Sequence, residues 1–396
     1  MSKNQAIILA IVGFIVIFVL AVVFGGFGIK EGSQKVNLTV WGTEDESSFR
    51  GIFADYSDVN KGVKIKYEKI DESGYEKKLV DALAAGNGPD IFMFHSDWLN
   101  QHKNKIVPAP SEIVPASKLD TLYPQIVASD FSDSGKVYAL PLYLDTLSLI
   151  YNRDSLDRKG VALPPKTWDE LETQVRKKRL IVSLGEKSDI IPRAKEILMS
   201  MMMQNGLKPA LGAVRLSGSE GQTALGFYTK FDSSKSAGSI NDFTAEKNDI
   251  IFDFQSASKL IHAQNPTLNF GYAPLPQFNS DSPVVIADYY GLAVSNKSQN
   301  PVAAWKLVSY ITTTQAVAEK FDLAANRPPA LRSLISLYSD SKEYGVFVKQ
   351  SLIARQWPQA DPDQLKKIFD DMIGYANSSN KIEDALRRAE SDLGSL

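Results

Sequence analysis

The chain has 396 residues, of which 44% are hydrophobic and 10% aromatic, and its 44 Lys and Arg nearly balance 46 Asp and Glu. This composition is typical of a packed globular protein, and the net charge of −2 argues against a nucleic-acid partner. The chain has no cysteine, which excludes disulfides, thiolate metal sites, thiol nucleophiles and an acylated cysteine. Its three histidines, His95, His102 and His262, lack metal-ligand spacing, so we expect structural or surface roles for them and no metal or other cofactor.

An uncharged apolar run spans residues 6–29. As a helix it would be about 36 Å long, enough to cross a bilayer core of about 30 Å. The run is longer than a signal-peptide core and ends in Phe24-Gly25-Gly26-Phe27 without an Ala-x-Ala cleavage site. Residues 1–29 are therefore predicted to form a cytoplasmic stub and an uncleaved single-pass membrane anchor. Residues 30–35 would be a linker, and the rest would lie outside the cytoplasm.

About 365 residues follow the anchor, more than one hydrophobic core usually serves, so two domains or lobes are expected. Hydrophobic periodicity predicts an alternation of strands and helices in the first part of this region. The expected order is a strand at 36–41, a helix at 47–57, a strand at 63–67, a helix at 75–85 and a strand at 90–94. This alternation indicates a parallel sheet.

The elements expected farther along the chain are less regular. Thr167, with Glu170 three residues on, is typical of a capping box at a helix start. The polar stretch 207–248 predicts loops and one short helix. The other expected strands lie at 136–141, 147–151, 180–185, 270–276 and 284–294, and the other helices at 191–206, 301–310 and 382–393.

Seven segments carry a joint resemblance to a known family. They are LTVWGT (38–43), AAGNGPDIFMFHSDWL (84–99), KVYALPLYLDTLSLIYNRDSL (136–156), PPKTWDEL (164–171), NPTLNFGYAPLPQ (265–277), NPVAAWKLVSYITT (300–313) and IEDALRRAESDL (382–393). In this order they resemble the extracytoplasmic solute-binding proteins of ABC importers, the family that includes maltose-binding protein.

The resemblance implies an α/β, two-lobed periplasmic-binding-protein fold of type II with hinge strands, here preceded by one N-terminal transmembrane helix. Lobe 1 would hold 36–144 and 292–322. Lobe 2, with hinge-packing helices, would hold 145–291 and 323–396, and the crossings would lie near Asp145, Tyr290 and Asn326. The implied function is to bind a small-molecule solute, a carbohydrate and more specifically an oligosaccharide, by hinge closure, and to present it to the permease subunits of an ABC importer.

A sugar site needs carboxylates or amides for the hydroxyls and aromatic rings for the apolar ring faces. Asp97 and Trp98 match the family position for such a carboxylate and aromatic, and structural packing is the alternative for every aromatic candidate. For Arg327, the alternative is an ion pair with a carboxylate between the lobes. The remaining candidates follow the first strand, lie in the crossings, or match a family position near the cleft; they are Trp41, Thr43, Glu44, Tyr143, Asp145, Tyr289, Tyr290, Asn326, Arg327 and Trp357.

Other functions are also compatible with the sequence. The same fold could bind a polyamine, a peptide or an oxyanion, and a membrane-tethered sensor ectodomain would have the same sequence features. A glycoside hydrolase would need two carboxyl groups at a fixed separation. Asp90 with Asp97, or Glu44 with Asp45, suggests such a pair only superficially, because neighbouring residues at one strand end face apart. We expect a binding protein and not an enzyme.

Overall fold

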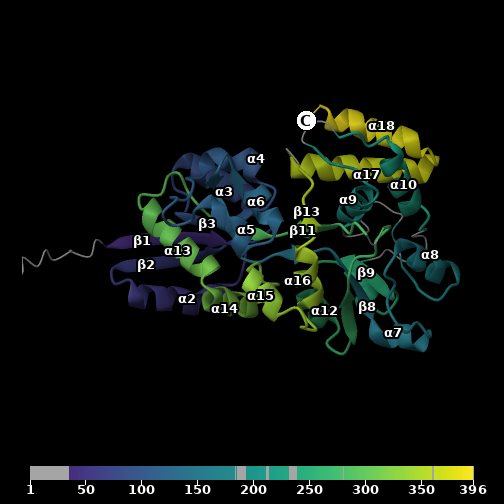
Figure 1. Cartoon of the computed structure of the whole chain (residues 1–396), viewed down its shortest axis with the longest axis horizontal. Helices are drawn as coiled ribbons and strands as arrows, with labels where there is room; N and C mark the ends of the chain where they lie inside the picture. The colour runs from purple at the N-terminus through teal and green to yellow at the C-terminus, as the bar shows by residue number, and fades with distance from the viewer. Residues whose placement is uncertain are drawn as a thin grey trace, which may run out of the picture.

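The computed structural model describes residues 35–182, 184, 193–210, 214–231, 239–279, 281–358 and 361–395. The predicted anchor at 6–29 lies outside these ranges. Within them, no helix is both long enough and apolar enough to cross a membrane. The elements form two groups that lie side by side along the long axis of the molecule, and we call them lobe 1 and lobe 2 (Figure 1).

Lobe 1 is built on a five-stranded sheet in the order β2-β1-β3-β12-β6. Strand β1 is parallel to β2 and to β3, which confirms the parallel arrangement predicted for the first three strands. The other two strands come from later in the chain, and β12 runs antiparallel to both β3 and β6. The strands are β1 (Val36–Gly42), β2 (Val63–Lys69), β3 (Ile91–His95), β6 (Ala139–Pro141) and β12 (Tyr290–Val294).

Helices cover both faces of this sheet (Figure 1). Helix α2 (Glu46–Val59) buries Phe49, Ile52, Phe53 and Tyr56, the face expected from its periodicity. Helix α3 spans Tyr75–Ala85, as predicted. The other elements of this lobe are α4 (Leu99–His102), α5 (Leu119–Leu122), α6 (Gln125–Phe131), α13 (Pro301–Thr313), α14 (Gln315–Ala325), two 3₁₀ turns (Lys103–Lys105, Ala116–Lys118) and a small ladder of β4 (Ser132–Asp133) with β5 (Lys136–Val137).

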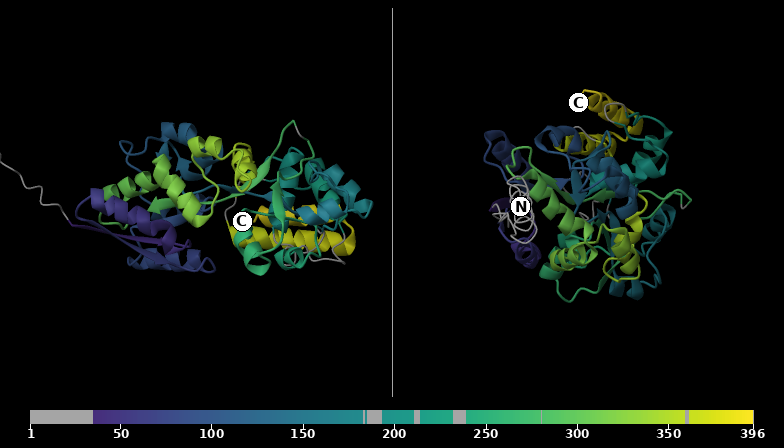
Figure 2. Two further views of the ribbon diagram at one scale, coloured as in Figure 1. Left: turned by 90° about the horizontal axis from the view of Figure 1, so that it is seen from below. Right: turned by 60° about the vertical axis from the view of Figure 1, so that its left-hand side comes forward.

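Lobe 2 has an antiparallel sheet in the order β10-β8-β9, made of β8 (Ser148–Asn152), β9 (Ile250–Asp253) and β10 (Phe270–Ala273). Helix α8 begins where predicted, because the Thr167 hydroxyl accepts a hydrogen bond from Glu170 N at 3.1 Å. The C-terminal helices α17 and α18 pack on lobe 2 (Figure 2). The helices of this lobe are α7 (Arg153–Arg158), α8 (Trp168–Arg176), α9 (Ala194–Gln204), α10 (Ser219–Tyr228), α11 (Ile240–Thr244), α12 (Ala257–Gln264), α17 (Pro362–Ser379) and α18 (Ile382–Leu393).

Four strand predictions need correction. The segment 136–141 forms two short strands in different sheets, β5 and β6. The described part of 180–185 is not a strand, because its backbone hydrogen bonds, Leu180 N to Gln174 O and Asp249 N to Ile181 O, are isolated and form no ladder. The strand predicted at 270–276 ends at Ala273, where Pro274 and Pro276 cannot donate to a ladder. The segment 284–294 forms two strands, because the strand is interrupted at Tyr289 and the chain passes from one sheet to another.

A third sheet joins the lobes, and we call it the crossing sheet. It has the order β13-β11-β7 and consists of β7 (Asp145–Thr146), β11 (Val285–Asp288) and β13 (Ala354–Arg355). Helix α16 (Gly345–Ser351) packs against this sheet, and its buried Gln350 side chain donates a hydrogen bond to Thr146 Oγ1 of β7 at 3.0 Å. Helix α15 (Arg332–Leu337) precedes α16. Segments that are distant in sequence therefore meet where the lobes meet.

Candidate functional site

Polar residues from lobe 1 and from the crossing sheet meet at the ends of β3, β11 and β13. Ser96 follows β3, and its backbone N–H donates to Tyr289 O at 3.0 Å. The Gln356 side chain, after β13, donates to Ser96 Oγ at 2.9 Å. These bonds fix the loop after β3 against the crossing sheet, so side chains from both parts share one site.

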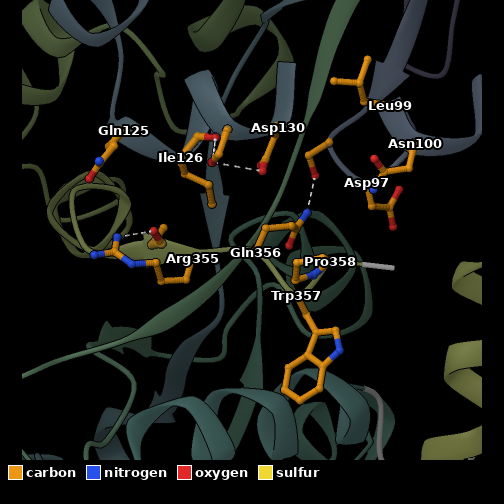
Figure 3. Close-up of a pocket in the computed structure, with 13 residues that line it drawn as sticks. Asp97, Leu99, Asn100, Gln125, Ile126, Asp130, Arg355, Gln356, Trp357 and Pro358 are labelled. Atoms are coloured by element: carbon orange, nitrogen blue, oxygen red, sulfur yellow. Dashed lines mark hydrogen bonds between the residues drawn. The ribbon is translucent and has the colours of Figure 1, made fainter. Parts of the chain in front are cut away.

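Two adjoining cavities lie at this junction, and together we call them the cleft. The larger, of about 430 Å³, lies between the loop after β3, helix α6 and residues 354–358 (Figure 3). The smaller, of about 110 Å³, is lined by His95, Asp288 and the first turn of α9. Both cavities are lined by Asp97, Gln356 and Trp357. Only the larger reaches the roughly 300–1,000 Å³ usual for small-molecule sites.

His95 lies between two carboxylates in the smaller cavity. Its Nδ1 is hydrogen-bonded to Asp97 Oδ1, and its Nε2 lies 2.5 Å from Asp288 Oδ1. Burial alone would lower the pKa of His95, but the charges and hydrogen bonds of Asp97 and Asp288 outweigh it and raise that pKa well above its usual value. In the ranges that the structure describes, no group of three or more acidic or histidine side chains is arranged to hold a metal ion.

Asp130, on α6, is a second perturbed carboxyl group beside the cleft. It lines the larger cavity, and Tyr289 donates its hydroxyl to Asp130 Oδ2 at 2.6 Å. Burial raises the pKa of Asp130 to about 8, although the Tyr289 hydrogen bond opposes the shift. Tyr289 is itself fully buried. The structure thus places this predicted site residue behind the cleft wall, where it orients Asp130.

Glu44, Tyr143 and Arg327 form a separate cluster next to the crossings. Arg327 Nη2 lies 2.7 Å from Glu44 Oε1, and the guanidinium carbon lies 4.7 Å from the centre of the Tyr143 ring. The Glu44 side chain is 4% exposed and that of Arg327 is 19% exposed. Sequence reasoning brought these residues forward as ligand-binding candidates and noted that Arg327 could pair with a carboxylate. The structure shows that pairing.

Asp145 and Asn326 hold the crossings in place. The Asp145 carboxylate accepts backbone hydrogen bonds from Thr146, Gln255 and Ser256 at 2.9–3.1 Å. Burial raises its pKa to about 7, and these bonds oppose the shift. Asn326 has a left-handed backbone with φ of 53°, and its side-chain oxygen accepts from the Tyr344 hydroxyl at 2.7 Å. Ligand contact by Asp145 or Asn326 stays a prediction.

The predicted aromatic residues are mostly packed against other side chains. The Trp98 indole is 5% exposed and lies with its centre 6.0 Å from the Tyr75 ring and 5.9 Å from the Tyr290 ring. Trp357 lines both cavities but is only 2% exposed. Half-buried Trp41 lies under the Lys78 ammonium group, 5.2 Å away. These rings therefore pack against other side chains and leave little exposed face on which a sugar ring could stack.

The structure therefore brings only part of the predicted set together. Asp97 and Trp357 line both cavities, and Trp98 and Tyr290 lie directly behind His95. Thr43 lies apart from them, with its backbone N–H directed at the Met93 sulfur at 3.3 Å. Ligand contacts by all of these residues stay a prediction.

Several cleft residues were not anticipated from the sequence. They are His95, Asn100, Gln125, Asp130, Lys195, Glu196, Asp288 and Gln356. One signal was available, because His95 stands two residues before Asp97 at the end of the same strand. For the others, the sequence gives no sign that they meet.

The carboxylate pairs considered for hydrolysis are not supported by the geometry. Asp90 and Asp97 lie beyond opposite ends of β3, and the Asp90 carboxylate accepts from Thr39 N at 2.9 Å and from Ser298 Oγ at 2.6 Å. The Glu44 carboxylate forms a hydrogen-bonded ion pair with Arg327. Asp90 therefore has a structural role at the start of β3.

Comparison with known proteins decides the family. Residues 41–318 match the model of the bacterial extracellular solute-binding protein family. The chain belongs to this family. It is 24% identical over 327 residues to the maltotriose-binding protein of Pyrococcus abyssi, which covers 77% of this chain and 68% of that protein.

Solved structures show the same fold. A cyclo/maltodextrin-binding protein complexed with maltotetraose superposes with a TM-score of 0.76 at 17% identity, covering 92% of this chain and 98% of the other. The sugar-binding protein MalE from Xanthomonas citri gives 0.75 at 20% identity, with coverages of 91% and 97%. The two-lobed α/β fold of this solute-binding protein is thus the one the resemblance implied.

Proposed function

We propose that this solute-binding protein is the receptor of an ABC importer and that it binds a carbohydrate, an oligosaccharide, in the cleft between its lobes. The observation that carries the proposal is the cleft itself, which opens where lobe 1 meets the crossing sheet. Asp97, Asp288 and Gln356 line it, and Trp357 forms part of its wall. Carboxylates accept hydrogen bonds from sugar hydroxyls, and an amide both donates and accepts.

The relatives support a ligand of several sugar units. One binds maltotriose by name, and a structural neighbour was solved with maltotetraose. The larger cavity extends from Asp97 and Asn100 on one side to Gln125 on α6 on the other, which gives room beyond the smaller cavity (Figure 3). Closure of the lobes about the crossing sheet would then present both lobes to the permease, because binding energy favours the closed state.

Attachment to the membrane through residues 6–29 is the second part of the proposal. The apolar run is long enough for one span, and strand β1 begins at Val36, directly after the predicted linker. Alkaline carbonate extraction of membranes tests this part. The full chain should stay in the membrane pellet, whereas its release would show that the segment is removed or does not span.

The ligand is tested by a thermal-shift screen of the full chain in a detergent without a sugar headgroup. Glucose, maltotriose and maltotetraose would be compared with spermidine, a tripeptide and phosphate. A ligand that binds only the folded state at a hundredfold excess over Kd adds about 2.7 kcal/mol of stability, which gives a readable shift. A shift confined to sugars supports the proposal, and a shift with another class overturns the ligand assignment.

Two controls sharpen the screen. Asp97→Asn should reduce the sugar-induced shift, whereas Asp371→Asn on the exposed side of α17 should leave it unchanged. Chromatography of the sugar after incubation should recover it intact, and smaller products would point to hydrolysis. Co-purification with permease subunits would separate an importer receptor from a sensor ectodomain.

A further inference from the structure

His95 is hydrogen-bonded to one carboxylate of lobe 1, Asp97, and to one carboxylate of the crossing sheet, Asp288. It stands at the end of β3, Asp97 follows in the next loop, and Asp288 ends β11. We propose that His95 is a positioning residue of the cleft, whose ring holds Asp97 and Asp288 together in the arrangement that binds the ligand. This rests on the proposed function for its ligand arm, whereas the charge state of the ring can be tested without any ligand.

The geometry favours a doubly protonated ring over a neutral one. A neutral imidazole has one N–H donor, and its other nitrogen is an acceptor that repels a carboxylate. Both ring nitrogens of His95 lie within hydrogen-bond distance of carboxylate oxygens, so only the imidazolium donates to both. The side chains of His95 and Asp97 are 17% and 7% exposed, so water screens this pair little, whereas the Asp288 side chain is 37% exposed and its pairing with His95 is screened more.

Loss of the ring proton would change the cleft. One of the two carboxylates would lose its donor, and Asp97 and Asp288 would repel each other without the positive charge between them. Loss of the His95–Asp288 bond would loosen the junction between lobe 1 and the crossing sheet, and loss of the His95–Asp97 bond would release the Asp97 carboxylate in the cleft. The ligand would then have to supply the free energy that His95 supplies in its protonated form.

Other charged groups surround the cluster and enter its pH dependence. Asp130 of α6 interacts electrostatically with both His95 and Asp97, and its own pKa is raised to about 8 by burial. Burial alone would raise the pKa of Asp288, but the charge and hydrogen bond of His95 and the positive charges of Arg193 and Lys195 outweigh it and hold that pKa below the usual range. The charged side chains that face the cluster from other elements are Asp130, Arg193, Lys195 and Glu196.

The direction of the pH dependence follows from the ring. The pKa of His95 is raised in the folded protein, so its contribution is fully present below the ordinary histidine pKa of about 6.5 and is lost as the pH rises through the higher folded value. Ligand affinity should therefore be constant at mildly acidic pH and should weaken on the alkaline side. A group with an ordinary pKa would produce this change near pH 6.5 instead.

The first test is the nitrogen-15 NMR spectrum of the histidine rings in the full chain without ligand. The chain has only three histidines, and His95→Gln assigns the signal. We expect both ring nitrogens of His95 to remain protonated at pH 7.5, where an ordinary histidine is neutral. A neutral His95 ring at that pH would overturn the proposal, and this result does not depend on whether any sugar binds.

The second test measures the Kd of maltotriose by calorimetry from pH 5.5 to pH 9.5. His102→Gln is a matched control, because His102 pairs with one carboxylate, Glu76, at 2.6 Å in lobe 1 and lines neither cavity. Wild type and His102→Gln should lose about tenfold in affinity at alkaline pH, the scale of one charged hydrogen bond. His95→Gln should bind about tenfold more weakly at pH 5.5 and should show no such decline.

Further outcomes keep the proposal separable from its alternatives. An unchanged pH profile in His95→Gln would overturn it, and so would a profile that Asp130→Asn abolishes, because Asp130 would then be the titrating group. Circular dichroism establishes that each variant is folded. If His95→Gln does not fold, the histidine signal is assigned with His102→Gln and His262→Gln, and the NMR test still decides. Absence of maltotriose binding to wild type would count against the proposed ligand alone.

Discussion

Replacing Asp322 by Asn should stabilise the protein in a way that depends on pH. Asp322 lies on α14, is 2% exposed, and neither carboxyl oxygen has a hydrogen-bond partner among the described residues. Burial raises its pKa well above the usual value, and the charge of Glu319 adds to the shift. The folded state therefore binds a proton at Asp322 more tightly than the unfolded chain does.

The size of the effect has an upper bound. An ordinary Asp has a pKa of about 3.9, so keeping Asp322 protonated at pH 7 costs at most about three pKa units, or about 4 kcal/mol. The contribution of Asp322 to stability is greatest below pH 3.9 and falls as the pH rises toward the folded pKa. Asn has nearly the same shape and also leaves a buried polar group unpaired, so the variant removes only the titration.

Urea unfolding of wild type and Asp322→Asn at pH 4 and pH 7 measures this effect. The two proteins should be equally stable at pH 4 within about 1 kcal/mol, and the variant should be more stable at pH 7 by up to about 4 kcal/mol. Asp371→Asn, at an exposed position, should show no such dependence. A difference that does not change with pH, or a loss of stability at pH 7, would refute the reasoning.

Three further predictions concern other contacts. Glu44→Gln should lower the free energy of unfolding by about 3 kcal/mol, because it leaves Arg327 without its buried partner. The double variant Glu44→Gln with Arg327→Met should recover part of this loss in urea titrations. If the effects of the two substitutions are additive, the pairing of Glu44 with Arg327 does not stabilise the protein. Thr167→Ala should cost about 1 kcal/mol by removing the N-cap of α8, and an unchanged urea midpoint would exclude a stabilising cap. Trp98→Ala should cost about 3–5 kcal/mol in stability, because the indole is buried, and it should weaken sugar binding by about 1–3 kcal/mol if the ring contacts the sugar. Calorimetry well below the melting temperature separates these two effects of Trp98→Ala, and an unchanged Kd would remove Trp98 from the site.

Local patterns predicted much of the fold. The bounds of α3 and α18 agree with the periodicity of their apolar residues, and the cap at Thr167 is present because its signal lies within four residues. The pattern failed at 180–185, where an apolar run has the composition of a strand but its described part makes only isolated backbone hydrogen bonds, with Gln174 and Asp249, and forms no ladder. Strand formation depends on a neighbour that the run itself does not specify.

The cleft was predicted less completely, because its contacts join distant segments. Asp97 was found from a motif, but its partner His95 also needs Asp288, 193 positions away in the chain. A sequence pattern likewise does not determine which way a ring turns, so Trp98 could be placed near the cleft without showing that it packs into lobe 1. Side chains with both a local motif and a local partner are the ones that sequence reasoning recovers.

The order of strands in lobe 1 has a consequence for how the protein is made. Strand β12 lies between β3 and β6, yet it is synthesised about 150 residues after β6, by which time the chain has passed through the whole sheet of lobe 2. Until residue 294 has been synthesised, β3 and β6 have no strand between them, and the five-stranded sheet is incomplete. Lobe 1 should therefore not fold as an independent amino-terminal unit during synthesis, and a chain truncated before β12 should remain open to proteases.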